Sequence, residues 1–324
     1  MIEPTVEVHL SQGQLDENLR SDARAGLSAA AKSLPPKWFY DARGSELFDR
    51  ITRLPEYYPT RTERELLRDS ATHVAEAASA QILVELGSGS SEKTRLLLGA
   101  LTEHGTLERY VPQDVSVAAL DSAVHQLARE FPSLQVHGIV SDFTDTLHNL
   151  PRGGRRMIAF LGGTLGNLVP DERAEFLGSV AEVLDEGEQL LLGVGLVTDP
   201  AVMVPAYDDA AGVTAQFNLN VLSVLNDRLG ANFDPSRFRH VALWDERNEW
   251  IEMRLEATEP MTVTVPAIDL EVSFAEGEQM RTEISAKFRV EGICKELDAA
   301  GFGSDRVWTD RRERFALVLA DRVR

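Results

Sequence analysis

The feature of this sequence that most constrains its fold is an alternation of short apolar runs with segments of helical spacing. Continuous apolar runs separated by helices are typical of a parallel sheet that is covered by helices on both faces. The apolar runs are Gln81–Leu86, Tyr110–Asp114, Val136–Val140, Arg156–Leu161 and Gln189–Leu196. The helical segments between them are Ser91–Ala100, Ser116–Glu130 and Asp171–Leu184. This alternation predicts a doubly wound α/β domain.

The chain on either side of this region follows other patterns. Before it, an amphipathic helix is expected at Leu19–Lys32, followed by a stretch rich in proline and aromatic residues that predicts irregular wrapping. After it, Asp199–Asp227 is helical in pattern, and two segments, Phe238–Thr258 and Met261–Phe274, alternate as antiparallel strands do. From Phe288 the earlier style returns, with a helix expected at 290–300 and strands at 306–309 and 315–320.

A chain that leaves a sheet and later returns to it indicates an inserted domain. We therefore expect an α/β domain built from residues 61–197 and 287–324. Residues 1–60 and 198–286 are expected to form a second, mixed α+β domain. A cleft between two such domains is the natural place for a ligand.

Composition limits the kinds of partner. The 324 residues include 33 Lys and Arg against 52 Asp and Glu, a formal charge of −19 that argues against nucleic-acid binding. Cys294 is the single cysteine, which excludes a disulfide framework. The N-terminus lacks the basic and apolar regions of a signal peptide, and no apolar stretch reaches the length of a membrane span. We expect a cytoplasmic protein that acts on something small and contacts no membrane.

The strongest local signal is the turn Glu85-Leu86-Gly87-Ser88-Gly89, which follows the first apolar run. Glycines let the backbone turn sharply and approach a ligand without a Cβ clash. The third glycine of a dinucleotide fingerprint is replaced by Glu92, and no Gly-Lys-Ser/Thr sequence occurs. Dinucleotide and P-loop readings are therefore disfavoured, although a tight turn that binds nothing would have the same sequence.

Carboxylates end the next two predicted strands. Asp114 ends the second, where it can accept hydrogen bonds from ribose hydroxyls, and Asp142 ends the third, next to Phe143 as an apolar wall for an adenine. Each aspartate alone reads more simply as a helix cap or a turn residue. With the glycine turn they favour an adenosyl ligand along the carboxyl edge of the sheet, as in class I S-adenosylmethionine sites.

Longer blocks of sequence carry a resemblance to a known family. The blocks are Lys32–Glu63 (KSLPPKWFYDARGSELFDRITRLPEYYPTRTE), Val84–Thr94 (VELGSGSSEKT), Phe160–Leu168 (FLGGTLGNL), Ala206–Asn218 (AYDDAAGVTAQFN), Ile251–Leu255 (IEMRL) and Gly277–Arg289 (GEQMRTEISAKFR). In this order, over nearly the whole chain, they resemble the actinobacterial histidine-specific methyltransferases of ergothioneine biosynthesis.

The resemblance implies a reaction and a fold. The reaction is trimethylation of the α-amino group of L-histidine to the betaine hercynine, with S-adenosylmethionine as donor and S-adenosylhomocysteine as product. The fold is a class I methyltransferase Rossmann-like doubly wound sheet, with residues 61–197 binding the donor and residues 198–286 setting specificity. No metal is expected, and the seven histidines show no metal-ligand spacing. A monomer is expected.

The resemblance also implies the site residues. Those at the donor are Gly87, Ser88, Lys93, Asp114, Asp142 and Phe143. Those at the histidine are Tyr57, Gly162, Asn167, Tyr207, Met253, Glu283 and Ser285. Asn167 and Tyr40 are the expected catalytic residues. Gly163, Leu165 and Gly195 look like altered versions of the family's usual residues, which leaves loop details open.

Plainer interpretations exist for several of these residues. Tyr57 fits a packing aromatic, Asn167 a turn residue, Glu283 an exposed charge, Met253 a core residue and Lys93 a solvated one. Two other functions also stay open. One is methylation of another amino acid such as tryptophan, which would leave the Glu283 carboxylate partly unpaired. The other is a non-catalytic module that binds an adenosyl ligand.

Overall fold

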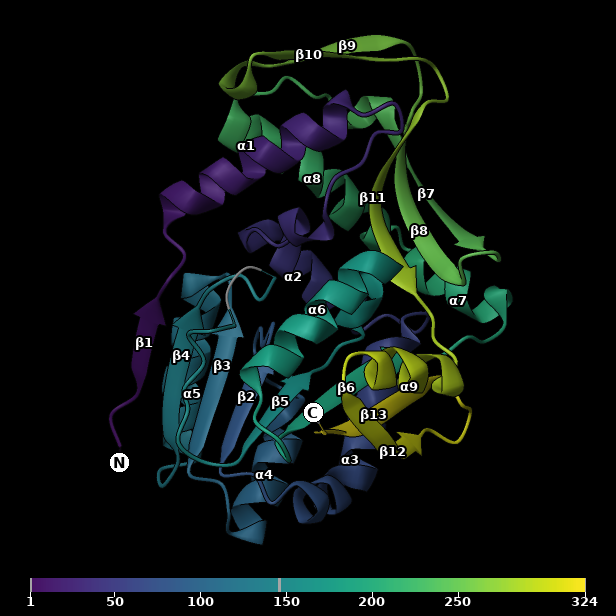
Figure 1. Cartoon of the computed structure of the whole chain (residues 1–324). Coiled ribbons are helices and arrows are strands. Elements are labelled where there is room, and N and C mark those ends of the chain that lie inside the picture. Colours follow the sequence, from purple (N-terminus) through teal and green to yellow (C-terminus); the bar gives the residue numbers. More distant parts are fainter. Residues whose placement is uncertain (1, 145–146, 324) are drawn as a thin grey trace. The chain divides into compact units, whose positions relative to one another are not determined.

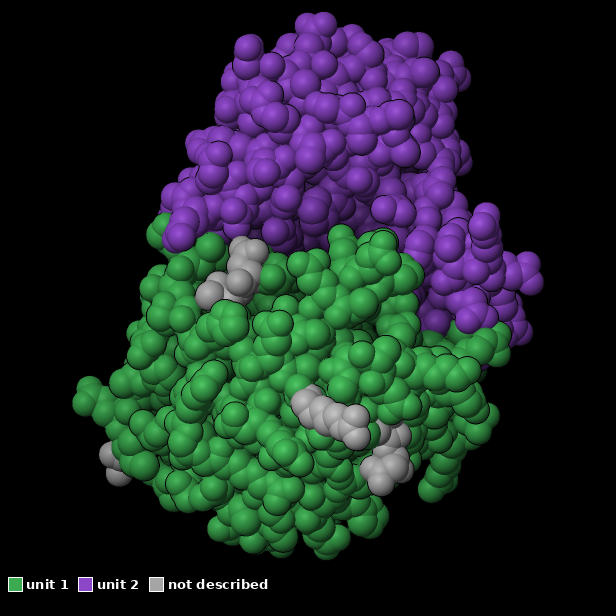
Figure 2. Space-filling view, viewed as in Figure 1, with its two compact units in different colours: residues 1–11, 61–197, 288–324 green, residues 12–60, 198–287 purple. Residues whose placement is uncertain are grey.

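The computed structural model describes residues 2–144 and 147–323 (Figure 1). The chain divides into two compact units (Figure 2). Unit 1 comprises Met1–Ser11, Arg61–Val197 and Phe288–Arg324, and unit 2 comprises Gln12–Thr60 and Thr198–Lys287. The predicted second domain began at residue 1, whereas the structure assigns the first residues to unit 1. The reason is a short strand, β1 (Thr5–Val8), that pairs with the sheet of unit 1.

Unit 1 is built on an eight-stranded sheet with the order β1-β4-β3-β2-β5-β6-β13-β12. Its strands are β1, β2 (Ile82–Leu86), β3 (Arg109–Asp114), β4 (Gln135–Val140), β5 (Arg156–Phe160), β6 (Gln189–Gly195), β12 (Phe302–Thr309) and β13 (Phe315–Arg322). The parallel part runs from β1 to β6, and Val84 of β2 lies between Val111 of β3 and Ile158 of β5. All five residues of β2 are buried, as its unbroken apolar sequence predicts.

The strand order places a topological switch point in the middle of this sheet. From β2 the chain moves outward through β3 and β4, then returns to the other side of β2 as β5 and moves outward again to β6. The crossover helices are α4 (Thr94–His104), α5 (Val117–Glu130) and α6 (Pro170–Val183). Because such crossovers are right-handed, α4 and α5 lie on one face and α6 on the other. Ligands of open α/β sheets bind at the carboxyl ends of the strands at this point, here beyond β2 and β5.

The last two strands of the sheet are antiparallel to their neighbours. β13 pairs antiparallel with β6, and β12 pairs antiparallel with β13, after α9 (Val290–Ala299). β12 also begins four residues earlier than the predicted strand 306–309. Two further elements of unit 1 were not predicted. They are β1 and the long helix α3 (Tyr58–Ala78), whose second residue is Pro59, a position where the missing N–H costs nothing.

Unit 2 joins helices to two small antiparallel sheets. Its elements are α1 (Gln12–Ser28), η1 (Pro36–Phe39), α2 (Ala42–Ile51), α7 (Pro200–Tyr207), α8 (Val213–Leu229), β7 (Phe238–Asp245), β8 (Trp250–Ala257), β9 (Met261–Val265), β10 (Leu270–Phe274) and β11 (Gln279–Ala286). The larger sheet has the order β11-β8-β7 and the smaller one pairs β10 with β9. Ile251, Met253 and Leu255 of β8 lie in one hydrophobic core with residues of α1, α2, α7 and α8.

The predicted single helix 199–227 is two helices, α7 and α8. The break is a turn at Asp208–Gly212, where Gly212 has a φ of 68°. The Asp209 carboxylate accepts hydrogen bonds from the backbone N–H groups of Val213 (3.0 Å) and Thr214 (2.7 Å), and so caps the start of α8. Within the described residues, every helix is too short or too polar to span a lipid bilayer.

Candidate active site

The glycine turn lies at the carboxyl end of β2 in unit 1. Gly87 and Gly89 have φ values of 66° and 51°, a region in which a Cβ is disfavoured. Ser91 also has a positive φ, of 51°, which delays the start of α4 to Thr94 rather than the predicted Ser91. A Cβ at Gly89 would meet no other atom within 4 Å, so this side of the turn is open to a ligand.

Asp114 holds the glycine turn from the end of β3. Its carboxylate accepts hydrogen bonds from the backbone N–H of Gly89 (2.9 Å) and of Ser116 (2.9 Å). Burial raises the pKa of Asp114, and these two backbone hydrogen bonds oppose the shift. Because each carboxylate oxygen can accept more than one hydrogen bond, acceptor capacity remains for a ligand.

Phe143 provides an apolar surface beside the same turn. A Cβ at Gly87 would lie 3.7 Å from its ring. The ring is held edge-on by Phe160, with centroids 5.1 Å apart, and by Phe176, with centroids 5.9 Å apart. The preceding residue, Asp142, is buried and accepts hydrogen bonds from the backbone N–H (2.9 Å) and hydroxyl (2.6 Å) of Thr144.

These residues fit the expected adenosyl ligand. The structure brings Gly87, Asp114 and Phe143 together as a backbone turn, an acceptor and an apolar wall. Ser88, between the two glycines, has a buried hydroxyl without a hydrogen-bond partner in the described chain. A buried polar atom of this kind is usually satisfied, so a ligand or a water molecule is expected there.

A partly buried ion pair connects the loops after β2 and β5. The Lys93 ammonium donates to the carboxylate of Glu63, a side chain of α3 that is 1% exposed. The same carboxylate accepts the backbone N–H of Gly162 at 2.6 Å. Lys93 is therefore held at the switch point, and the plainer interpretation of it as a solvated residue was wrong.

Glu85 forms a second buried network beneath the glycine turn. The hydroxyls of Thr94 and Tyr110 donate to its carboxylate, and Glu85 is 4% exposed. Burial raises the pKa of Glu85 to about 7, while these two hydrogen bonds and the charge of Lys93 oppose the shift. The network fixes the end of β2 to the start of α4.

Asn167 ends the short helix η2 (Thr164–Asn167), which follows β5. Its side chain is half-buried. Gly162 and Gly163 before it have φ values of 83° and 70°, so two consecutive residues in left-handed conformation shape this loop. Gly163 is one of the residues that look altered relative to the family pattern, and a glycine suits its left-handed conformation.

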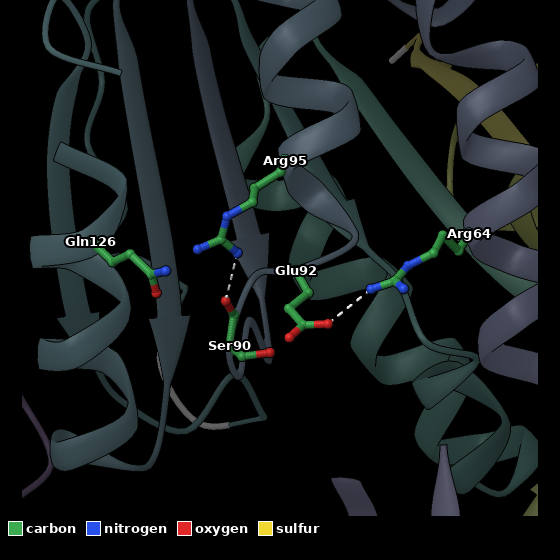
Figure 3. Close-up of a pocket in the computed structure, with 5 residues that line it drawn as sticks. All are labelled: Arg64, Ser90, Glu92, Arg95 and Gln126. Carbon is green, nitrogen blue, oxygen red and sulfur yellow. Dashed lines mark hydrogen bonds and ion pairs between the residues drawn. The ribbon is translucent and has the colours of Figure 1, made fainter. Parts of the chain in front are cut away.

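Near the glycine turn lies a pocket of about 330 Å³ (Figure 3). It is lined by Arg64, Ser90, Glu92, Arg95 and Gln126. Its two guanidinium groups have protein partners, since Arg64 pairs with Glu92 (2.8 Å) and Arg95 donates to the Ser90 carbonyl (3.1 Å). None of the residues that line it belongs to the predicted site, so we do not assign the adenosyl ligand to it.

In unit 2, three polar groups form a closed triangle. The Lys287 amino group donates to the hydroxyl oxygens of Tyr207 (2.8 Å) and Ser285 (2.7 Å), and those two oxygens are 2.8 Å apart. All three residues are buried, with exposures of 6–7%. The Lys287 nitrogen also lies 4.9 Å from the centre of the Tyr207 ring. Burial raises the pKa of Tyr207, which keeps the phenol protonated.

A β-bulge decides the direction of the polar side chains on β11. Met280 lies opposite Leu255 of β8, but the register then shifts, and Glu283 lies opposite Met253. Since directly opposite residues share a face, Glu283 lies on the core side with Met253, and Ser285 follows on that side. Without the extra residue Thr282, strict alternation would place both on the other face. The interpretation of Glu283 as an exposed charge was wrong, because its side chain is half-buried.

The predicted tyrosines of unit 2 belong to one chain of ring contacts. Tyr57 packs edge-on against Tyr207 (centroids 6.1 Å apart) and Phe48 (6.2 Å), and Phe48 packs against Tyr40 (5.5 Å). Tyr40 is 43% exposed, and Phe217 packs against it from α8 at 5.5 Å. The structure thus brings Tyr40, Tyr57 and Tyr207 together. The predicted core position of Met253 is confirmed, with 2% exposure.

Sequence reasoning assigned no role to several residues of these networks. They are Phe48, Glu63, Glu85, Phe217 and Lys287. Glu85 offered a signal, because an acidic residue inside an apolar strand run needs a buried partner. Lys287 offered none, since its alternation with Glu283 and Ser285 matches that of a solvated strand face. Among the described residues, no three His, Cys, Asp or Glu side chains are grouped to hold a metal ion.

Two known proteins are similar in sequence to this chain over nearly its whole length. The family model described as "Histidine-specific methyltransferase, SAM-dependent" matches residues 19–322. Histidine N-alpha-methyltransferase of Mycolicibacterium smegmatis is 52% identical over 97% of this chain and 98% of its own length. The protein of the same name from Mycobacterium tuberculosis is 51% identical over 98% of each chain. Ergothioneine biosynthesis protein 1 of Neurospora crassa is 34% identical, over 61% of this chain and 23% of its own.

The doubly wound sheet, its glycine turn and its strand-end carboxylates define a class I S-adenosylmethionine-dependent methyltransferase. With the match over residues 19–322, the chain belongs to the family of histidine-specific, S-adenosylmethionine-dependent methyltransferases.

Proposed function

We propose that this protein transfers three methyl groups from S-adenosylmethionine to the α-amino group of L-histidine, giving hercynine for ergothioneine biosynthesis. The observation that carries the proposal is the 52% identity to a histidine N-alpha-methyltransferase over almost the full length of both chains. We propose L-histidine as the methyl acceptor because the sequence similarity extends through unit 2, where the Tyr207–Ser285–Lys287 triangle lies.

The donor supplies a methyl group on a positively charged sulfur, and a neutral amine must attack it. In each round a C–N bond forms, the C–S bond breaks, and its electron pair stays on sulfur. The free amino acid loses one proton before the first transfer, and the methylated amine loses one before each later transfer. The third transfer gives a quaternary nitrogen that has no proton to lose.

We assign binding of the methyl donor, S-adenosylmethionine, to residues of unit 1. Gly87 and Gly89 let the backbone approach the ligand, Asp114 accepts from the ribose hydroxyls, and Phe143 packs against the adenine. Asp142 is proposed as a further acceptor at the adenine. Lys93, held by Glu63, fixes the position of the Gly162 loop and so acts as a positioning residue.

We assign the acceptor mainly to unit 2. Glu283 accepts a ring N–H of histidine, Ser285 serves the other ring nitrogen, and Met253 provides a flexible apolar wall. Tyr57 donates a hydrogen bond to the substrate, and Tyr207 lines the same site beside Ser285. From unit 1, Asn167 and Gly162 are proposed to bind the amino-acid end of the substrate.

Catalysis in this proposal is mostly positioning, which holds the amine about 3 Å from the methyl group along the line of the breaking bond. Asn167 orients the amine for this attack, and the exposed ring of Tyr40 stabilises the cationic product by a cation–π interaction. We propose that solvent takes the protons. A metal-free reaction, a monomeric state and a cytoplasmic location remain predictions.

The test is mass spectrometry of L-histidine incubated with enzyme and S-adenosylmethionine. We expect a product that carries three added methyl groups, formed with S-adenosylhomocysteine. A parallel reaction with L-tryptophan tests the alternative acceptor. If neither amino acid is methylated while S-adenosylmethionine still raises the melting temperature, the protein is a binding module and the proposal fails.

A further inference from the structure

The triangle of Lys287, Tyr207 and Ser285 leaves one of its two hydroxyl hydrogens unused. A lysine ammonium has three donors and no acceptor, so Lys287 donates to both hydroxyl oxygens. The 2.8 Å contact between Tyr207 and Ser285 uses the hydrogen of one hydroxyl. The other hydroxyl hydrogen has no partner within the triangle and is left for a ligand.

The chemistry of the two hydroxyls decides which of them keeps that hydrogen. A phenol is a stronger hydrogen-bond donor than an aliphatic alcohol, so Tyr207 donates to Ser285. The Ser285 oxygen has two lone pairs, and Lys287 and Tyr207 occupy both of them. Ser285 can then only donate to a ligand and cannot accept from it.

Glu283 has the opposite property and lies two residues earlier on the same face of β11. Its register partner is Met253, and that of Ser285 is Ile251, both on the core side of β8. A carboxylate only accepts hydrogen bonds. The strand therefore presents one obligate acceptor and one obligate donor, at a separation of about 7 Å.

We propose that Lys287 is a specificity-determining residue, which fixes Ser285 as a donor so that the Glu283–Ser285 pair selects the neutral imidazole of histidine in a single tautomer. The inference rests on the proposed function, because it assumes that histidine binds between these residues. A neutral imidazole has one N–H for Glu283 and one lone pair for Ser285. An imidazolium has two N–H groups and would direct one of them at the Ser285 hydrogen.

The groups that surround Lys287 are compatible with this role. In unit 2 they are Glu283 of β11, Tyr207 at the end of α7 and Tyr58, the first residue of α3. Burial lowers the pKa of Lys287, while Glu283 and Tyr58 oppose the shift and favour the charged form. Lys287 touches the Tyr207 and Ser285 hydroxyls and is a positioning residue, not a catalytic base.

The test is calorimetric titration of histidine into enzyme saturated with S-adenosylhomocysteine, at pH 7.5 and at pH 5.5. The neutral fraction of an imidazole with a pKa near 6.5 falls about tenfold between these values, so wild-type affinity should fall about tenfold. In Lys287→Met one lone pair of Ser285 becomes free to accept from an imidazolium. The fall should then shrink to less than about threefold.

Two controls separate this effect from general damage. Lys32→Met removes a partly buried lysine of the same unit that pairs with Glu278, and it should keep the tenfold fall. The histidine analogue 3-(1,2,4-triazol-3-yl)alanine has a ring that stays neutral over this range, so its affinity for the wild type should not change with pH. Lys287→Arg, which keeps the charge, should restore part of the discrimination.

Either of two results would overturn the inference. One is a fall in histidine affinity that is the same in Lys287→Met as in the wild type, and the other is an equal fall for the triazole analogue. If Lys287→Met does not fold, the protonation of ¹⁵N-labelled histidine bound to the wild-type enzyme at pH 5.5 is measured by nitrogen NMR instead. A bound ring that carries protons on both nitrogens would contradict the inference. Failure of the proposed function looks different, since wild-type enzyme would then not methylate histidine at all.

Discussion

At the scale of single residues, Asn167 is expected to contact the methyl acceptor but not the methyl donor. It ends the loop that follows β5, and its backbone conformation does not depend on a special φ, unlike that of Gly162 and Gly163. We expect Asn167→Ala to lower turnover with histidine about 10- to 100-fold through misplacement of the amine. The affinity for S-adenosylmethionine, measured by calorimetry, should stay within about twofold of the wild-type value.

The control for this variant is Asn149→Ala, which removes an exposed asparagine of the same unit. It should leave turnover and affinity unchanged. Equal losses of turnover and of donor affinity in Asn167→Ala would mean that the residue shapes the loop instead of the substrate site.

Glu283 is the residue expected to recognise the side-chain ring of the methyl acceptor. Loss of a hydrogen bond to a charged group costs about 1.5–3 kcal/mol, so Glu283→Ala should raise the KM for histidine about tenfold or more. The same change removes the penalty of an unpaired carboxylate for an indole ring and opens space beside Met253. In a competition assay with both amino acids in one tube, the ratio of histidine betaine to tryptophan betaine should fall.

Glu276→Ala is the matched control, because Glu276 is an exposed carboxylate shortly before β11. Its product ratio should equal that of the wild type. If the ratio in Glu283→Ala is also unchanged, Glu283 does not contact the ring.

At the scale of elements, the turn between β2 and α4 is the part most directly built for a ligand. An alanine at Gly89 would meet no protein atom within 4 Å, yet it would occupy the space through which a ligand approaches the backbone. Whether or not a ligand binds there, an alanine with this positive φ would lower the free energy of unfolding by about 1–2 kcal/mol. We expect Gly89→Ala to weaken S-adenosylmethionine binding about tenfold or more, which is at least about 1.4 kcal/mol.

Gly187 offers a control with the same strain. Its φ is 82°, and an added Cβ there would also meet nothing within 4 Å. Gly187→Ala should lose similar stability in urea unfolding but keep the wild-type affinity for S-adenosylmethionine in calorimetry. Equal affinities in the two variants would show that the glycine turn does not approach the ligand.

At the scale of the whole molecule, Glu85 links stability to pH. Burial raises its pKa from 4.5 to about 7, so the folded state binds this proton more tightly than the unfolded state does. The stability contributed by this proton is complete below pH 4.5 and is lost as the pH rises through about 7. Between pH 5 and pH 8 this loss should amount to about 2–3 kcal/mol of the free energy of unfolding.

The measurement is urea unfolding of wild type and Glu85→Gln at both pH values. Because glutamine does not titrate, the stability of the variant relative to the wild type should rise by that amount at the higher pH. Glu103→Gln, at an exposed position on α4, should show no such change. A constant difference between Glu85→Gln and the wild type would mean that Glu85 does not bind a proton over this range.

Much of unit 1 could be predicted because its strands follow from patterns of apolar residues that lie close together in the sequence. The five apolar runs became β2, β3, β4, β5 and β6, since a strand buried on both faces must be apolar throughout. β1 was missed because it has four residues with little burial and is held by pairing with β4, a partner about 130 positions away. The start of α3 was assigned to irregular wrapping because Pro59 was taken as a breaker, although proline fits the first turn of a helix.

The sequence by itself determined the sheet, its glycine turn and the carboxylates that follow β3 and β4, because periodicity and turn chemistry act over a few residues. It also carried the blocks that identify the family. Only the tertiary structure decided what Glu283, Ser285 and Lys287 face. Their alternation matches that of a solvated strand, and the bulge at Thr282 turns them to the core side. A single extra residue reverses the face of every side chain after it, and its place is fixed by pairing with β8 rather than by local sequence.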